Sequence, residues 1–277
     1  MSLFSSASRF ALAACLSISL SAGHAVAQPA EKPFEPSVGQ DGKDVIWVPT
    51  PQALVDKMLD MAKVTPDDYV VDLGSGDGRT VITAAKRGAR AHGIEYNPQM
   101  VELSKANAQK EGVSDKATFE QGDIFVTDFS KADVVTMFLL TSLNLKLRPT
   151  ILDMKPGTRV ASNTFDMGEW KADEEAIVTE GCTSYCKAYF WIVPAKVDGT
   201  WTLDKGELTL KQSFQTFTGT IKNDNVIVPV TDGKLRGDEI SFKAGGAEYT
   251  GKVSGSSIEG VTKSGSIETK WQAKRGA

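Results

Sequence analysis

Hydrophobic and polar positions follow two different rhythms along this chain, and the change between them falls near residue 195. Over residues 45–194, short apolar runs typical of buried strands alternate with stretches whose apolar positions repeat at helical spacing. Such alternation is typical of an α/β fold built on a mainly parallel sheet. After residue 195, short segments alternate apolar with polar residues and are separated by turn residues. The pattern predicts an α/β domain over residues 45–194 and an all-β domain over residues 195–277.

Each expected element of the α/β domain is defined by its range. Helices are expected over 51–62, 79–87 and 98–110, with a fourth that passes through residues 145 and 151. Strands are expected over 69–73, 91–95, 117–121, 132–139 and 158–162. The all-β pattern predicts about eight strands in a small barrel or a sandwich. Trp201 and Trp271 lie near its two ends and are expected to fill its interior.

The first 27 residues have the pattern of a secretory signal peptide. Arg9 is the single charge before an apolar run over residues 10–20, and an A-x-A motif ends at Ala27. A run of this length is too short to span a bilayer, which needs about 20 apolar residues. We expect cleavage after Ala27, export to the periplasm or secretion, and no membrane span afterwards; an uncleaved anchor is the alternative. Residues 28–44, rich in proline, glycine and charge, are expected to form a flexible leader.

Composition then narrows the classes of function. The net charge of −4 offers no basic surface for nucleic acid, so no nucleic-acid partner is expected. The two histidines, His24 and His92, exclude a site that needs several imidazoles, and three cysteines cannot build a four-Cys zinc site, so no metal site is expected. After cleavage Cys182 and Cys186 remain. Export allows them to form a disulfide across a short turn, and two reduced, packed thiols are the alternative.

The strongest candidate for chemistry is a glycine loop between the first expected strand and its helix. Residues 72–79 read Asp-Leu-Gly-Ser-Gly-Asp-Gly-Arg, with G-x-G-x-G spacing in place of the dinucleotide-binding G-x-G-x-x-G. The carboxylates of Asp72 and Asp77 would repel a diphosphate. They suit a cationic or zwitterionic ligand without phosphate, and S-adenosylmethionine (SAM) fits that description through its sulfonium and ammonium groups.

Two further acids follow neighbouring strands and extend this interpretation. Glu95 ends the second strand and can accept hydrogen bonds from a ribose diol. Asp123 follows the third strand and can accept the exocyclic amine of adenine, with Ile124 beside the ring; a turn aspartate is the alternative. The predicted SAM-binding residues are Asp72, Gly74, Ser75, Gly76, Asp77, Gly78, Glu95, Tyr96, Asp123 and Ile124.

Over about residues 45–175 these motifs resemble those of class I, seven-β-strand SAM-dependent methyltransferases. The subgroup that the chain resembles most is that of the mitochondrial ATP-synthase c-subunit lysine methyltransferases and their bacterial relatives. The motifs that carry this resemblance are Trp47–Pro51, Gly93–Pro98, Lys155–Val160 and Phe165–Trp170. The resemblance implies a Rossmann-like seven-stranded sheet, with its last two strands at 176–180 and 187–193, followed by an appended β-module.

The resemblance also implies an activity, namely methyl transfer from SAM to an acceptor, and a protein lysine is the candidate acceptor. Aromatic faces can hold an amine by cation–π contact. The candidate acceptor-pocket residues are Phe138, Leu139, Thr141, Phe165, Asp166 and Trp170. The segment after the fourth strand lacks the Asn/Asp-Pro-Pro-Tyr/Phe tetrad of amino-group DNA methyltransferases. Two alternatives stay open: an exported, non-catalytic binding protein that retains the methyltransferase fold, and a nicotinamide-dependent oxidoreductase.

Overall fold

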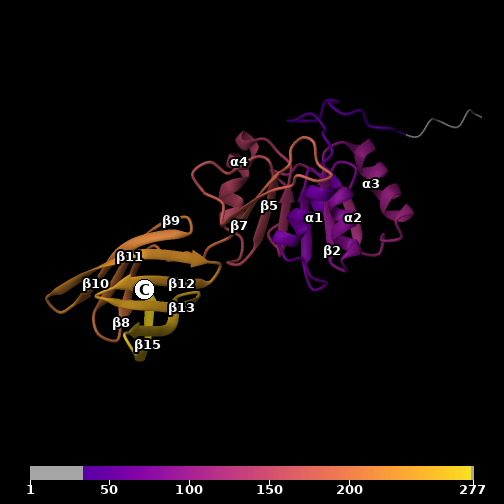
Figure 1. Cartoon of the computed structure of the whole chain (residues 1–277). Coiled ribbons are helices and arrows are strands. Elements are labelled where there is room, and N and C mark those ends of the chain that lie inside the picture. Colours follow the sequence, from indigo (N-terminus) through magenta and orange to yellow (C-terminus); the bar gives the residue numbers. More distant parts are fainter. Residues whose placement is uncertain (1–33, 276–277) are drawn as a thin grey trace, which may run out of the picture. The chain divides into compact units, whose positions relative to one another are not determined.

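The computed structural model describes residues 34–275 (Figure 1). The expected signal peptide and residues 28–33 of the leader lie outside the described residues. The helices are α1 (Gln52–Met61), α2 (Arg79–Lys86), α3 (Pro98–Lys110) and α4 (Thr141–Leu152). In residues 34–275, no helix is both long enough and apolar enough to cross a membrane.

The α/β part contains one seven-stranded sheet in the order β3-β2-β1-β4-β5-β7-β6. Its strands are β1 (Tyr69–Leu73), β2 (Arg90–Glu95), β3 (Ala117–Gln121), β4 (Val134–Met137), β5 (Arg159–Asn163), β6 (Glu174–Ile177) and β7 (Lys187–Ile192). Strands β1 to β5 are parallel, whereas β7 is antiparallel to both of its neighbours. The expected Rossmann-like methyltransferase sheet is therefore confirmed.

Burial on both faces explains why the central strands are continuous apolar runs. In β1, Val70 packs into a core with α1, α2 and α3, whereas Val71 and Leu73 pack into a second core with α4. A parallel sheet covered on both faces needs apolar residues at successive positions. Because β1 to β5 run in the same direction, their carboxyl ends lie side by side at one edge of the sheet.

The end of β6 differs from the expectation. The strand covers Glu174–Ile177 and so begins two residues before the expected range of 176–180. The chain leaves the sheet after Ile177 because residues 182–186 form a short loop closed by a disulfide. The Val178 amide donates to the Cys186 carbonyl at 2.9 Å and joins the two ends of that loop.

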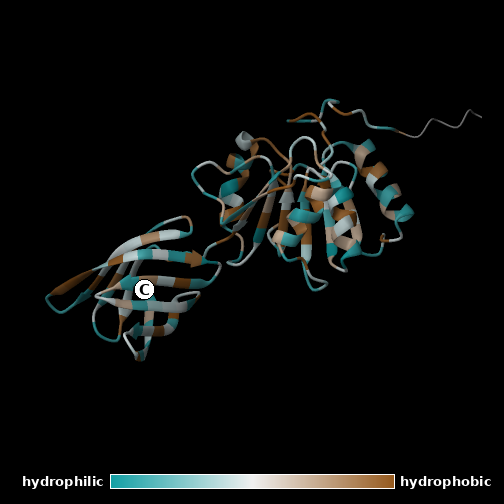
Figure 2. Ribbon diagram, in the orientation of Figure 1, coloured by the Kyte–Doolittle hydropathy of each residue, from teal (hydrophilic) through white to brown (hydrophobic). Residues whose placement is uncertain are grey.

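The last part of the chain is a closed, eight-stranded antiparallel barrel rather than a sandwich. Its strands are β8 (Gly199–Leu203), β9 (Glu207–Ser213), β10 (Thr216–Asn223), β11 (Val226–Arg236), β12 (Glu239–Ala244), β13 (Ala247–Ser254), β14 (Ser257–Ser264) and β15 (Ile267–Arg275). Apolar and polar residues alternate along these strands (Figure 2), as in β12, where every second residue is buried. This alternation fits an interior filled by side chains.

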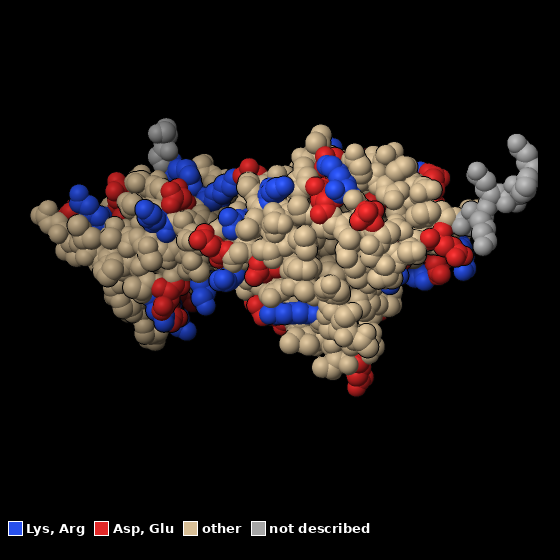
Figure 3. All heavy atoms as spheres, turned by 90° about the horizontal axis from the view of Figure 1, so that it is seen from above, with Lys and Arg blue, Asp and Glu red and all other residues tan. Residues whose placement is uncertain are grey.

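The two tryptophans of the barrel differ in burial. Trp201 is fully buried, donates its Nε1 hydrogen to the Val197 carbonyl at 2.8 Å and lies under the guanidinium of Arg275. Trp271 is half-buried and donates to the Thr250 carbonyl at 3.0 Å. The expectation that tryptophans fill the interior is confirmed most clearly for Trp201. Basic and acidic side chains are interspersed over the face shown in Figure 3.

Candidate active site

A cavity of about 520 Å³ opens where the parallel strands end. Segments that follow β1, β2, β3 and β4 all line it. The order of the strands reverses between β1 and β4, and open α/β sheets bind ligands at this kind of crevice. The volume also lies within the range of about 300–1,000 Å³ that is usual for small-molecule sites.

The glycine loop forms the floor of this cavity and needs its glycines. Gly74, Gly76 and Gly78 have φ angles of +77°, +55° and +82°, in the left-handed region that favours glycine. A Cβ atom on Gly76 would lie 2.7 Å from Nε1 of Trp47. Gly74 and Gly76 line the cavity, but Gly78 does not. Gly78 instead forms the N-cap of α2, so it shapes the turn and is not in place to contact a ligand.

Glu95 is fixed against this loop by the backbone. Its Oε2 accepts a hydrogen bond from the Gly76 amide at 3.0 Å, and its Oε1 accepts one from the Asn97 amide at 2.9 Å. The half-buried carboxylate lines the cavity. Because a carboxylate oxygen has two lone pairs, each oxygen keeps capacity for one more donor. The geometry fits the diol of a ribose.

Asp72 is a buried acid at the end of β1. Its side chain lines the cavity, and Oδ1 accepts a hydrogen bond of 2.6 Å from the Thr136 hydroxyl. Burial raises the pKa of Asp72 to about 7; the hydrogen bond from Thr136 opposes the rise, and the charges of Asp77 and Glu95 add to it. A carboxylate without a cationic partner in such surroundings gains stability from a bound cation.

Asp77 and Ser75 contribute less than their sequence positions suggest. Asp77 lines the cavity but forms an ion pair of 2.6 Å with Arg79, which offsets the negative charge that the sequence assigns to it. Ser75 also lines the cavity, while its side chain packs over Gly93 and its Oγ has no hydrogen-bond partner. The acidic character of the site therefore comes mainly from Asp72 and Glu95.

Asp123, Tyr96 and Ile124 also line the cavity, and in this structure a lysine lies among them. Lys43 Nζ is 2.6 Å from Oδ2 of Asp123 and 5.0 Å from the centre of the Tyr96 ring. This hydrogen bond lowers the pKa of Asp123, helped by the donation of the Phe125 amide. The group expected to accept the adenine amine thus already holds a cation.

The segment that carries Lys43 was expected to be a flexible leader. Residues 40–50 instead line the cavity. The Gly39 amide donates to the Trp47 carbonyl at 2.8 Å, and the Trp47 amide donates to the Gln40 carbonyl at 2.9 Å, which folds the segment back on itself. The signal in the sequence that could have indicated this is Trp47 itself, an aromatic residue in an otherwise polar stretch.

The acceptor-pocket candidates separate into two groups. Phe138, Leu139 and Phe165 line the cavity. Thr141 and Asp166 are absent from its lining; the Thr141 hydroxyl donates to Oδ1 of Asp166 at 3.4 Å. Trp170 was misplaced by the sequence interpretation, because it is fully buried in the core next to Trp191 and takes no part in the lining. Tyr185, which the sequence interpretation missed, lines the cavity as well.

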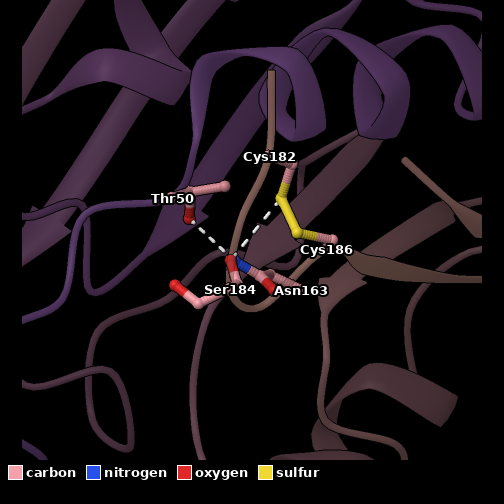
Figure 4. The surroundings of a disulfide bond; sticks show 5 residues. All are labelled: Thr50, Asn163, Cys182, Ser184 and Cys186. Carbon is pink, nitrogen blue, oxygen red and sulfur yellow. Dashed lines mark hydrogen bonds between the residues drawn. A yellow bond between two sulfur atoms is a disulfide. The ribbon is translucent and has the colours of Figure 1, made fainter. Parts of the chain in front are cut away.

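Tyr185 belongs to a loop closed by the disulfide between Cys182 and Cys186. Of the two alternatives for these cysteines, the structure contains the bonded pair. Figure 4 shows the loop beside Thr50 and Asn163, where the Asn163 side-chain amide donates to the Thr50 hydroxyl at 3.2 Å. Thr50 lines the cavity, so the loop and the cavity wall are neighbours.

Comparison with known proteins identifies relatives of the α/β part. A family model described as the ANTKMT methyltransferase domain matches residues 72–174. A protein-lysine N-methyltransferase of Saccharolobus islandicus is 43% identical over 152 residues, which are 54% of this chain and 94% of the relative. The lysine N-methyltransferase of Xenopus laevis that is named for the ATP synthase c-subunit is 34% identical and matches 58% of this chain and 63% of its own length.

A solved structure agrees with these relatives on the fold and the cofactor. It is that of an RNA methyltransferase from Salinibacter ruber in complex with S-adenosyl-L-homocysteine (SAH). The two chains are 45% identical with a TM-score of 0.51, and the match covers 54% of this chain and 96% of the other. The names of the relatives give different acceptors, a protein lysine in one case and RNA in another. The identity of the acceptor therefore has to be argued from the cavity.

Proposed function

Because the chain belongs to the family of SAM-dependent methyltransferases that includes the protein-lysine N-methyltransferase of Saccharolobus islandicus, we propose that it methylates the amine of a lysine side chain. The observation that carries this choice of acceptor is the aromatic wall formed by Phe138 and Phe165 in the cavity that the glycine loop also lines. Aromatic faces and an apolar opening suit the alkyl chain and the ammonium of lysine.

The predicted cofactor residues fit SAM. Glu95 has free acceptor capacity for the ribose hydroxyls, and Asp123 accepts from an amine in this structure. Asp72 supplies a buried carboxylate near the loop, where a cationic group lowers its pKa again. The left-handed glycines at 74 and 76 let the backbone approach the ligand closely.

Bound SAM supplies a methyl group on a positively charged sulfur. The amine nitrogen forms a bond to that carbon while the carbon–sulfur bond breaks, and its electron pair stays on the sulfur of neutral SAH. The lysine ammonium has to lose one proton to water to expose its lone pair. Apolar walls favour the neutral amine, since burial lowers the pKa of a lysine. The remaining contribution of the protein is alignment of the two reactants.

The compartment is part of the proposal. The signal-peptide pattern predicts export, and the Cys182–Cys186 disulfide supports an oxidising compartment such as the periplasm. The function would then require a supply of SAM outside the cytosol. Detection of the mature chain in a periplasmic extract, with its new N-terminus at Gln28, tests this part.

The test of activity uses the purified mature protein, radiolabelled SAM and two acceptors, poly-L-lysine and total RNA. We expect label in methyllysine after acid hydrolysis of the first acceptor and none in RNA. Glu95→Ala should abolish both SAH binding and transfer. Glu102→Ala on the exposed face of α3 is the matched control. Label only in RNA would overturn the lysine assignment.

A further inference from the structure

Three aromatic side chains from separate parts of the chain meet in one wall of the cavity. Phe138 follows β4, Phe165 follows β5, and Tyr185 lies in the disulfide loop between β6 and β7. The ring centres of Phe138 and Tyr185 are 5.2 Å apart with an edge-to-face arrangement, and Phe165 lies 6.1 Å and 6.4 Å from them. We call this group the aromatic wall.

The aromatic wall lies next to the floor of the cavity. Leu139 directly follows Phe138, and its Cδ2 would be 3.3 Å from a Cβ atom on Gly74. One residue therefore separates the wall from contact with the glycine loop. Tyr185 is 41% exposed, which leaves part of its ring open to an incoming group. A cation that reaches this ring interacts with its face at distances up to about 6 Å.

The backbone of Tyr185 adopts a conformation that tyrosine disfavours. Its φ angle is +54°, in the left-handed region, where side chains with a Cβ crowd the backbone. The residue persists there because its neighbours constrain it: Cys186 is bonded to Cys182, and its carbonyl accepts the Val178 amide. Removing the disulfide removes one of these two constraints.

The cofactor region does not share this dependence. Tyr185 is the one residue of the loop 181–186 that lines the cavity in the described part of the chain. Glu95 and Asp123 are fixed by contacts to residues 43, 76, 97 and 125, none of which belongs to the loop. A change in the loop therefore reaches the acceptor side of the cavity first.

We propose that the aromatic wall receives the amine and alkyl chain of the acceptor, and that the Cys182–Cys186 disulfide holds Tyr185 in that position. Acceptor binding then depends on the oxidation state of the two cysteines, whereas SAM binding does not. Reduction by a dithiol transfers two electrons and two protons to the disulfide and gives two thiols and a cyclic disulfide of the reductant. The inference rests on the proposed lysine methylation and assigns a positioning role to the disulfide.

The experiment separates cofactor binding from acceptor binding. SAH affinity is measured by calorimetry. The SAH-loaded protein is then titrated with n-butyltrimethylammonium, a cation that binds aromatic faces without needing turnover. The apparent KM for poly-L-lysine provides the kinetic readout. The variants are Tyr185→Leu, Tyr185→Phe and the double variant Cys182→Ser/Cys186→Ser; Ser184→Ala in the same loop is the matched control.

We expect every variant to bind SAH within about twofold of the wild type. Tyr185→Leu should weaken binding of the quaternary ammonium and raise the KM by about tenfold, which corresponds to a strong cation–π contact. Tyr185→Phe and Ser184→Ala should stay within about threefold. The double serine variant should behave like Tyr185→Leu, and a dithiol should impose the same loss on the wild type but not on the double variant.

Two results would overturn the inference. Unchanged ammonium binding and KM in Tyr185→Leu would remove the aromatic wall from acceptor binding. Loss of SAH binding in the double serine variant, in parallel with acceptor binding, would make the disulfide a general stabiliser of the fold. A wild-type protein that binds SAH but no quaternary ammonium would refute this inference and leave the methyltransferase assignment intact, whereas failure to bind SAH would refute the latter.

Discussion

Replacing Asp72 with asparagine should make the unliganded protein more stable and its cofactor binding weaker. The carboxylate is buried at the end of β1, and burial raises its pKa to about 7 from an ordinary value of 3.8. Asparagine has the same shape. Its Oδ1 can accept the Thr136 hydroxyl as Asp72 does, and its Nδ2 can donate to the Thr80 hydroxyl, which already bonds to this side chain.

The size of the effect follows from linkage between protonation and folding. Between about pH 4 and pH 7 the folded state holds a proton on Asp72 that the unfolded chain has lost, so stability falls as the pH rises through this window. At about 1.4 kcal/mol for each pH unit, ionised Asp72 costs the folded state roughly 1.5 kcal/mol near pH 5 and roughly 4 kcal/mol near pH 8. Asp72→Asn should exceed the wild type by these amounts.

Urea unfolding of the unliganded protein near pH 5 and near pH 8 measures this difference, followed by the helical circular dichroism signal. In the described residues all helices belong to the α/β part, so the signal reports on the domain that holds Asp72. Calorimetry should show at least tenfold weaker SAM binding, because the ammonium loses an anionic partner.

Asp133→Asn is the control with the opposite sign. Burial opposes ionisation of Asp133, but hydrogen bonds from Lys155 and the Tyr69 amide outweigh it and lower the pKa. Asparagine at this position should therefore destabilise the protein near pH 8. If Asp72→Asn is no more stable than the wild type near pH 8, or if its advantage is the same near pH 5, the electrostatic argument about Asp72 is refuted.

Three further predictions test other contacts. Lys43→Ala should tighten SAH binding about two- to fivefold at low salt in calorimetry, since the adenine amine then no longer competes for Asp123; weaker binding would contradict this. Gly76→Ala should destabilise the protein by about 1–3 kcal/mol and weaken SAH binding, because its φ is +55° and Trp47 Nε1 is in the way; a wild-type melting temperature would count against it. Trp201→Ala should lower the unfolding free energy of the barrel by about 3–5 kcal/mol in urea, far more than an exposed Val→Ala change.

The parts of the fold and site that the sequence predicted are those encoded over short stretches. The glycine loop places Asp72, Gly74 and Gly76 within five residues, and the loop's left-handed turns require glycine at those points. Glu95 was found because the end of the next parallel strand necessarily comes next to the loop after β1. The barrel was predicted from period-two alternation, which depends only on the local direction of side chains.

The parts that the sequence did not predict depend on contacts between distant residues. Trp170 occurs in the same motif as Phe165, and packing against Trp191 decides that it is buried while Phe165 lines the cavity. Lys43 and Tyr185 lie in irregular segments, where no periodicity shows which way a side chain points. Their positions result from how these segments fold back over the ends of the strands.

The closure of the barrel also determines where the chain could add to itself. Every barrel strand has a neighbour on both sides, so within residues 34–275 the open backbone edges of the two sheets are those of β3 and β6. Strand β6 has only four residues, and two of its exposed side chains are the glutamates 174 and 175. Short, charged edge strands discourage intermolecular strand pairing. A protein with so much β-structure can therefore stay free of amyloid-like association, which the proposed export beyond the cytosolic chaperones would require.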